Sequence, residues 1–369
     1  MSQAASGHRI GVIGSHGAVG RMLVELLRRS GCEVVCANRT RRTPDEGSFL
    51  VDARNAAGVR EFAQGCGVVV NCAGPSYIIR DSVAGALPSG TIYVDPFGGS
   101  VFNDYDGQCA CVINAGCTPG LSGLLARYVA RRLDRCVSVT VCSGGREQGG
   151  VAGFADVILS TRDGYGYPGQ MLVDGAPCPY VKRDGEEADM DSFPSDAEAV
   201  HSPFVTDELR NVASAHGIPM LTGMLVIPDR DSLHLLLKAM TSSHTDDPDE
   251  LMRMFSRIDG SKSRLDAGRE NWFALQVSAR GYVGNSFRRV GVTVRAQDSS
   301  ELSSIILAEV VFRCLDIDQL RGVHWGCEFL DPNSVIGSLE SSGVTIEHAT
   351  AHHATETRPD NELVESGFV

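Results

Sequence analysis

The chain has 369 residues, of which 43% are hydrophobic and 21% are charged, and its formal net charge is −13 at pH 7. This length is large for a single core, so we expect two domains or one domain with a large insertion. The acidic balance argues against non-specific nucleic-acid binding. Because no apolar run approaches the roughly 20 residues that cross a bilayer and no secretory signal pattern is present, we expect a cytoplasmic protein without membrane segments.

Short apolar runs alternate with helix-like stretches over the first 120 residues. Strands are predicted at 9–14, 32–38, 48–53, 67–75, 91–96 and 110–117, and helices at 18–31, 56–66 and near 79–87. Continuous apolar strands that alternate with helices are typical of a parallel sheet covered on both faces. We therefore expect residues 1–120 to form an α/β domain with a doubly wound parallel sheet.

The remainder of the chain has a different pattern of hydrophobic residues. Predicted elements are a helix within 118–134, a strand at 136–145, an antiparallel hairpin at 271–298 and a capped helix at 299–315. The acidic stretch at 182–199 is expected to be a surface loop. We expect an α+β domain with a mostly antiparallel sheet at 121–298, a C-terminal helix and return segment at 299–346, and a disordered tail at 347–369.

Twelve cysteines are scattered along the chain, mostly in strand-like apolar runs. The spacing of Cys109, Cys111 and Cys117 lacks the second Cys pair or the His pair that a zinc site needs. We therefore expect buried free thiols in a reducing compartment, and no metal site.

Three glycines lie between the first predicted strand and the first predicted helix, with the spacing GxxGxxG. In such a turn the first glycine permits the bend, the second lets backbone N–H groups approach a pyrophosphate, and the third lets helix and strand pack closely. Packing alone also produces glycine-rich turns, but the alternating strands and helices that follow favour dinucleotide binding in a Rossmann domain. The cofactor contacts expected here are Gly14, Ser15, His16, Gly17, Ala18 and Val19.

The segment "CANRTRR" at 36–42 ends the second strand, about 20 residues beyond the glycines, where an NAD site places an acidic residue on the ribose hydroxyls. Here the tip of the strand is Asn38, Arg39 and Thr40. An arginine suits a 2′-phosphate, with Asn38 and Thr40 as further donors, so the segment favours NADPH; a solvated basic loop is the alternative. Asp52, at the end of the third strand, is expected to accept a hydrogen bond from the adenine amino group.

The segments "GVIGSHGAVGR", "VVNCAGPS", "IYVDPFGG" and "INAGCTPGLSGLLARY" resemble the saccharopine dehydrogenase family of reductases, over roughly residues 9–130 and more faintly near 326–332. The resemblance implies a Rossmann domain whose cleft is covered by a β-rich domain, and hydride transfer to or from a carbon–nitrogen bond. It also places Cys72, Ala73, Gly74 and Pro75 beside the ribose and nicotinamide. In size and texture the chain is more similar to compact relatives that reduce a thiazoline ring during siderophore assembly.

Three functions are compatible with this pattern. The first is an NADPH-dependent reductase of a cyclic imine, acting on a small molecule or on a substrate tethered to a carrier protein of a peptide-synthetase assembly line. The second is a saccharopine- or opine-type dehydrogenase that acts on the adduct of an amino acid and a keto acid. The third is a non-catalytic NADP-binding partner. The hairpin at 272–296 could present a sheet face for a homodimer, or the chain's own helices could cover that face.

Reduction of a C=N bond needs a hydride and a proton delivered to nitrogen, from a group whose pKa is near the working pH or from a polarised hydroxyl. Each candidate also has a structural interpretation: Asp95 could cap a helix, the tyrosines could pack between the domains, and a lone histidine is commonly structural. Activation could also be electrostatic, with no essential acid. The catalytic candidates are Tyr77, Asp95, Glu147, Tyr167 and His201.

Overall fold

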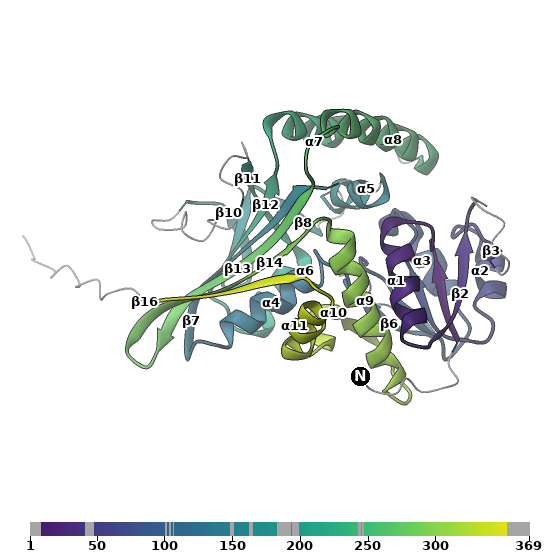
Figure 1. Cartoon of the computed structure of the whole chain (residues 1–369), viewed down its shortest axis with the longest axis horizontal. Helices are drawn as coiled ribbons and strands as arrows, with labels where there is room; N and C mark the ends of the chain where they lie inside the picture. The colour runs from purple at the N-terminus through teal and green to yellow at the C-terminus, as the bar shows by residue number, and fades with distance from the viewer. Residues whose placement is uncertain are drawn as a thin grey trace, which may run out of the picture.

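The computed structural model describes residues 9–40, 48–99, 102, 105, 107–147, 151–161, 165–182, 193, 199–242, 245 and 247–352. Two β-sheets organise these residues, one in each half of the molecule (Figure 1). In the described ranges, no helix is both long enough and apolar enough to cross a membrane.

The first sheet has seven strands in the order β15-β6-β5-β4-β1-β2-β3, and every pair is parallel. This confirms the predicted doubly wound sheet. The strand order reverses between β1 and β4, and ligands of such sheets bind in the crevice at the carboxyl ends of the strands there. The strands are β1 (Arg9–Ile13), β2 (Glu33–Asn38), β3 (Ser48–Leu50), β4 (Cys66–Asn71), β5 (Ile92–Val94), β6 (Ala110–Ile113) and β15 (Val323–Trp325).

Helices cover both faces of this sheet, which explains why its central strands are continuously apolar. Val12 in β1, Val69 in β4 and Cys111 in β6 are all fully buried. On one face α1 packs against α9, and on the other α2 packs against α3 (Figure 1). These helices are α1 (Ala18–Arg29), α2 (Ala56–Phe62), α3 (Ser76–Ala86) and α9 (Ser299–Leu315).

The second sheet is mixed and mostly antiparallel, as predicted, with β7 and β12 as its parallel pair. Its main path is β10-β9-β12-β7-β13-β14-β16, and β11 and β8 extend it from β12. The predicted hairpin is formed by β13 and β14, which close at the Val283–Ser286 pair. The strands are β7 (Arg135–Arg146), β8 (Gly166–Pro168), β9 (Gln170–Val173), β10 (Ala176–Pro179), β11 (Val200–Thr206), β12 (Met220–Ile227), β13 (Trp272–Val283), β14 (Ser286–Ala296) and β16 (Thr345–His352).

Two groups of helices accompany this sheet. The wholly buried α4 packs on β7 and β13, beside α6, α10 and α11. Figure 1 shows α7 and α8 lying across the top of the molecule, where α8 packs on α5, and α5 in turn packs on α3 of the first domain. The helices are α4 (Leu121–Ala130), α5 (Val151–Ser160), α6 (Asp207–Ala215), α7 (Arg230–Ser242), α8 (Pro248–Leu265), α10 (Gly326–Phe329) and α11 (Pro332–Ser341).

The prediction of a disordered tail from residue 347 is wrong for its first part. Residues 345–352 form β16, which pairs antiparallel with β14 from Arg295↔Thr345 to Arg288↔His352. Without β16, β14 would present a long row of unpaired backbone groups at the edge of the sheet. Ile346, opposite Val294, packs against the core. Backbone pairing therefore compensates for the low hydrophobicity on which the prediction rested; residues 353–369 lie outside the described residues, as does most of the predicted acidic loop.

Candidate cofactor site and inter-domain cleft

The glycine turn after β1 is shaped by close backbone contacts. Gly14 has φ +80°, and a Cβ on it would lie 2.5 Å from the Ala73 nitrogen and 2.7 Å from the Cys72 carbonyl oxygen. A Cβ on Gly20 would overlap the Gly14 carbonyl and lie 2.9 Å from the Ser15 Cα. The chain therefore needs glycine at both positions in order to fold.

Gly17 is different, because its surroundings restrict a side chain less than those of Gly14 and Gly20 do. It is exposed, its φ is −68°, and a Cβ at this position would have the Gly14 carbonyl oxygen as its nearest neighbour, at 3.3 Å. The N–H groups of the first turn of α1, at Ala18 and Val19, have no partner within the helix, as at any helix start. In the described part of the chain, no side chain caps α1 either. Such a helix start is suited to bind an anion such as a pyrophosphate.

Asn38 holds this turn in place. Its Oδ1 accepts a hydrogen bond from the His16 N–H at 2.9 Å, and its Nδ2 donates to the Ser15 hydroxyl at 2.7 Å. The Asn38 amide, predicted as a further donor to the 2′-phosphate, thus holds the glycine turn, and its Nδ2 also donates to the Ser48 hydroxyl of β3 at 3.5 Å. Arg39 and Thr40, which follow it, are exposed.

A cavity of about 200 Å³ lies beside the turn, at the carboxyl ends of the strands. Its walls combine apolar side chains with four charged residues. The lining brings together many of the residues predicted to bind the cofactor, and it adds residues of α3 and α8. It consists of Ile13, Gly14, Asn38, Arg39, Val51, Asp52, Ala53, Arg54, Ala73, Gly74, Pro75, Ile78, Ile79, Asp249 and Met252.

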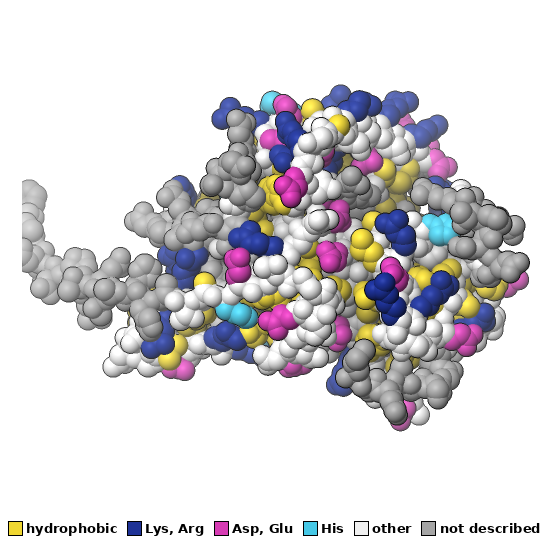
Figure 2. Space-filling model, viewed as in Figure 1, with side chains coloured by type: hydrophobic (Ala, Val, Ile, Leu, Met, Phe, Trp, Pro, Cys, Tyr) yellow, Lys and Arg dark blue, Asp and Glu magenta, His cyan; other side chains and the backbone are white. Residues whose placement is uncertain are grey.

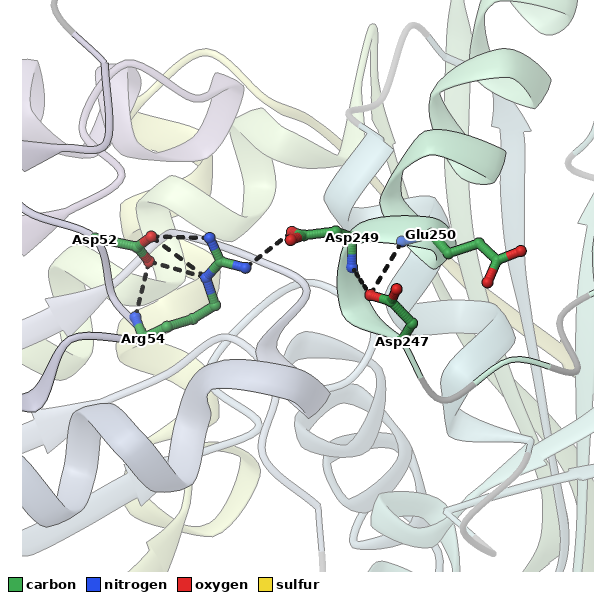
Figure 3. A network of polar contacts seen from close by, with 5 residues as sticks. All are labelled: Asp52, Arg54, Asp247, Asp249 and Glu250. Atoms are coloured by element: carbon green, nitrogen blue, oxygen red, sulfur yellow. Dashed lines mark hydrogen bonds and ion pairs between the residues drawn. The ribbon is translucent and has the colours of Figure 1, made fainter.

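Arg54 joins two carboxylates across this cavity (Figure 3). Its Nη2 donates to Asp52 Oδ2 at 2.9 Å, and its Nη1 donates to Asp249 Oδ1, also at 2.9 Å. The hydrogen bond from Arg54 holds the pKa of Asp52 below its ordinary value, so Asp52 is ionised at neutral pH. Asp52 was predicted to contact the adenine amino group; here Arg54 occupies that carboxylate, and neither Arg54 nor Asp249 was predicted.

The loop between β4 and α3 carries Ala73, Gly74 and Pro75, and it lies directly against α5 of the second domain. A Cβ on Gly74 would be 2.7 Å from the Ala152 Cβ. The Asp156 carboxylate, also on α5, accepts the backbone N–H groups of Ser76 at 3.0 Å and Tyr77 at 3.1 Å. The second domain therefore caps α3, and burial raises the pKa of Asp156 to about 7.

Tyr77 begins α3 immediately after this loop. Its ring stacks on Tyr165 with the centroids 5.1 Å apart, and the buried Arg80 guanidinium lies 4.7 Å from the centre of the Tyr77 ring. Burial raises the pKa of Tyr77, so its hydroxyl keeps its proton at neutral pH. Tyr77 can therefore donate a hydrogen bond beside the loop.

Asp95 is fully buried at the end of β5. Its carboxylate accepts hydrogen bonds from Asn71 Nδ2 at 2.9 Å, from the Ser76 hydroxyl at 2.9 Å and from the Phe97 N–H at 2.8 Å, and also from the Tyr93 hydroxyl. Burial raises the pKa of Asp95 in spite of these bonds. These contacts tie the end of β5 to the start of α3.

The other three catalytic candidates lie in separate surroundings. Glu147 accepts the Ser299 N–H at 2.7 Å, at the start of α9, and burial raises its pKa. The Tyr167 hydroxyl accepts from Arg210 Nη1 at 3.1 Å. His201 on β11 meets Phe193 edge to face at 5.5 Å, and burial lowers its pKa, so that it is neutral at neutral pH. Glu147, Tyr167 and His201 therefore contact different residues from those that Tyr77 and Asp95 contact.

Comparison with known proteins connects this geometry to nucleotide-binding folds. Residues 10–87 match the model of the NAD dependent epimerase/dehydratase family. Saccharopine dehydrogenase (L-Glu forming) from Saccharomyces cerevisiae has a similar structure, with a TM-score of 0.63 and 13% sequence identity; the match covers 94% of this chain and 100% of that one. Comparison with curated protein sequences finds no significant match.

DAP dehydrogenases are similar to a lesser degree. A variant of the meso-DAP enzyme from Clostridium tetani has a TM-score of 0.49 and 12% identity, over 90% of this chain and 98% of that one. The enzyme from C. glutamicum has a TM-score of 0.46 and 13% identity, over 91% and 99%. The likeness to the yeast saccharopine dehydrogenase, at 13% identity, establishes the fold alone: the chain has a Rossmann domain and a second α+β domain in the arrangement of that enzyme.

Proposed function

We propose that the chain is an NADPH-dependent reductase that transfers a hydride to a C=N bond, with a thiazoline intermediate of siderophore assembly as its substrate. The observation that carries the cofactor assignment is the turn at Gly14–Gly20. Two of its glycines are required by the backbone, and the third is open to a ligand at an uncapped helix start. A dinucleotide pyrophosphate accounts for that third glycine.

The choice of NADPH over NADH rests on Arg39. It follows β2, lines the cavity, and is exposed. An exposed guanidinium at this point can bind a 2′-phosphate with two parallel hydrogen bonds. The residues between β1 and α3 thus supply a pyrophosphate site, an adenosine cavity and a cation at the place of the 2′-phosphate.

At the nicotinamide end of the proposed site, side chains of the protein bind the substrate and provide hydrogen-bond donors. NADPH supplies the hydride when it is bound. Tyr77 is the best placed of the five catalytic candidates, because it directly follows the loop of Ala73–Pro75 and its hydroxyl keeps its proton. We assign to this hydroxyl a hydrogen bond to the imine nitrogen, which stabilises the electron density that moves onto that atom during reduction.

A saccharopine- or opine-type dehydrogenase is the second candidate. The observation in its favour is the likeness to the yeast saccharopine dehydrogenase, which extends over both domains. The two candidates share the cofactor and the carbon–nitrogen bond, and they differ in the substrate that enters the cleft.

One assay separates the candidates. Purified protein is mixed with NADPH and either a thiazoline thioester or a keto acid together with an amino acid, and consumption of NADPH is followed. Consumption with the thiazoline alone supports the proposal, and consumption with the keto acid and amino acid alone supports the second candidate. Binding of NADPH without turnover of either would identify a non-catalytic NADP-binding partner.

A further inference from the structure

The cavity beside the glycine turn is lined by residues of both domains. Asp249 and Met252 of α8 line the same cavity as Val51, Asp52 and Ala53 of the first domain. The hydrogen bond from Arg54 to Asp249 joins residues that are 195 positions apart in the chain. Figure 1 shows the corresponding arrangement, with one end of α8 extending over the Rossmann half.

The faces of α8 have separate contacts. Leu251, Phe255 and Ile258, at helical spacing, are buried in a cluster with α5 and α7. Asp249 and Met252 are three positions apart and face the cavity. On the outer side Arg253, Arg257 and Arg264 are exposed, in the region where Figure 2 shows basic side chains gathered over α7 and α8.

This division means that the cavity-facing residues of α8 are not needed to fold the helix or to pack it on its own domain. The cluster around Phe255 anchors α8 on its own domain, whereas the side chains of Arg54 and Asp249 are 42% and 69% exposed. An exposed ion pair contributes little to folding stability. Because both residues line the cavity, the pair can instead fix the position of the end of α8 relative to the first domain.

The cavity itself is suited to a flat, mainly apolar group. Val51, Ala53, Ile78 and Ile79 line it from the first domain, and Met252 adds a flexible thioether side chain from the second. Methionine adapts to irregular surfaces and makes favourable contacts with aromatic rings. Arg54, held from one side by Asp52, is oriented so that its Nη1 meets Asp249 (Figure 3).

We propose that α8 is part of the cofactor site, with Met252 packed against the adenine ring and the Arg54–Asp249 ion pair holding the end of α8 over it. This inference rests on the proposed function, since it takes the cavity to be the adenosine pocket. It means that cofactor affinity is shared between the domains, and that the second domain has a role in cofactor binding besides covering the substrate.

The test measures binding of 5′-AMP to the full chain. This probe fills the adenosine pocket and has no 2′-phosphate on which the charge of Asp249 could act. We expect Met252→Ala to weaken 5′-AMP about fivefold, through loss of one apolar contact, and Met252→Leu to restore most of the affinity. Asp249→Asn should weaken 5′-AMP about two- to fivefold, the range of an exposed ion pair, and less so in high salt.

The matched control is Glu250→Gln. Asp249 and Glu250 both lie in the first turn of α8, so each substitution removes the same favourable charge at the helix start. Glu250 instead accepts a hydrogen bond from the Thr245 hydroxyl at 2.9 Å. The control should bind 5′-AMP like the wild type, and thermal melts should show all four variants folded.

The outcomes separate this inference from the proposed function. If the wild type binds 5′-AMP and NADPH but Met252→Ala and Asp249→Asn bind the probe as tightly as Glu250→Gln does, the role of α8 is wrong and the cofactor assignment stands. If the wild type binds neither 5′-AMP nor NADPH nor NADH, both are wrong. The readout is binding, so the substrate that is reduced does not affect the result.

Discussion

Gly14, Gly17 and Gly20 share one turn but are glycine for different reasons. The backbone around Ala73 excludes a side chain at Gly14, and the Gly14 carbonyl excludes one at Gly20. Gly17 is exposed and has ordinary backbone angles, and a Cβ on it would lie 3.3 Å from the Gly14 carbonyl oxygen, so the fold restricts this position less than the other two, and the proposed cofactor accounts for its small size. The sequence spacing predicted the turn, but the distinction between folding and binding glycines depends on contacts with the β4–α3 loop, which no spacing reveals.

Two substitutions at the turn and at the tip of β2 separate pyrophosphate binding from 2′-phosphate binding. Arg39→Ala should weaken NADPH by about 10- to 100-fold, the worth of a charge-assisted hydrogen bond, while NADH binding changes little. Gly17→Ala should weaken both cofactors by the same factor, because both carry the pyrophosphate. Fluorescence titration of each reduced cofactor measures these affinities.

Equal losses of NADPH and NADH in Arg39→Ala would contradict the assignment of the 2′-phosphate to Arg39. The neighbouring Asp52 makes this a demanding test, because its ionised carboxylate lies in the same cavity and would repel a phosphate. Arg54 offsets that charge. A preference for NADPH therefore requires that Arg39 attract the 2′-phosphate more strongly than the carboxylates around it repel it.

At the scale of elements, α3 depends on a residue from the other domain. Pro75 precedes the helix and provides no side-chain cap, and Asp156 on α5 accepts the first N–H groups instead. Burial raises the pKa of Asp156 to about 7, compared with about 3.9 in an unfolded chain. Between these two values the native state binds a proton that the unfolded state does not.

The raised pKa of Asp156 makes the free energy of unfolding fall as pH rises. Stability from Asp156 is fully present below pH about 4 and is lost as pH rises through about 7, at up to about 1.4 kcal/mol per pH unit. Asp156→Asn removes the titration, so the free energy of unfolding of the variant relative to the wild type should rise between pH 5 and 8, by roughly 1–3 kcal/mol. Urea unfolding at a series of pH values measures it.

The exposed Glu250→Gln serves as the control, and its profile should parallel that of the wild type. Glu208, whose pKa burial also raises to about 7, is present in every protein compared and cancels in the differences. Parallel profiles for the wild type and Asp156→Asn would show that the carboxylate is not protonated in the folded protein at pH 5.

Local patterns predicted some elements well and left others out. The hairpin of β13 and β14 and the helix α9, capped by Asp298, form where alternation and capping placed them. The long helix α8 was missed although its signals are present: Asp247 caps it, Pro248 begins it, and apolar residues follow at helical spacing. The strand β16 carries a weak signal, because its partner strand rather than its own composition stabilises it.

At the scale of the whole molecule, the change of texture near residue 120 predicted two halves, and the glycine turn predicted which half binds the nucleotide. The contacts that join the halves could not be predicted. Arg54 meets Asp249, and Ser76 meets Asp156, across 195 and 80 positions of the chain. No local periodicity specifies such pairs, because they depend on how α5 and α8 of the second domain pack against the first domain.

The central claim is that hydride passes from NADPH to the carbon of a C=N bond in the cleft between these halves. The most direct measurement uses NADPH carrying deuterium at C4, prepared in both stereochemical forms, together with a thiazoline thioester and the wild-type protein. Mass spectrometry then locates the label in the product.

One of the two labelled cofactors should give a thiazolidine with a single deuterium on the carbon that was doubly bonded to nitrogen, because a bound nicotinamide presents one face to the substrate. A reduced product without deuterium from either form, or no reduced product from a protein that binds NADPH, would contradict the claim.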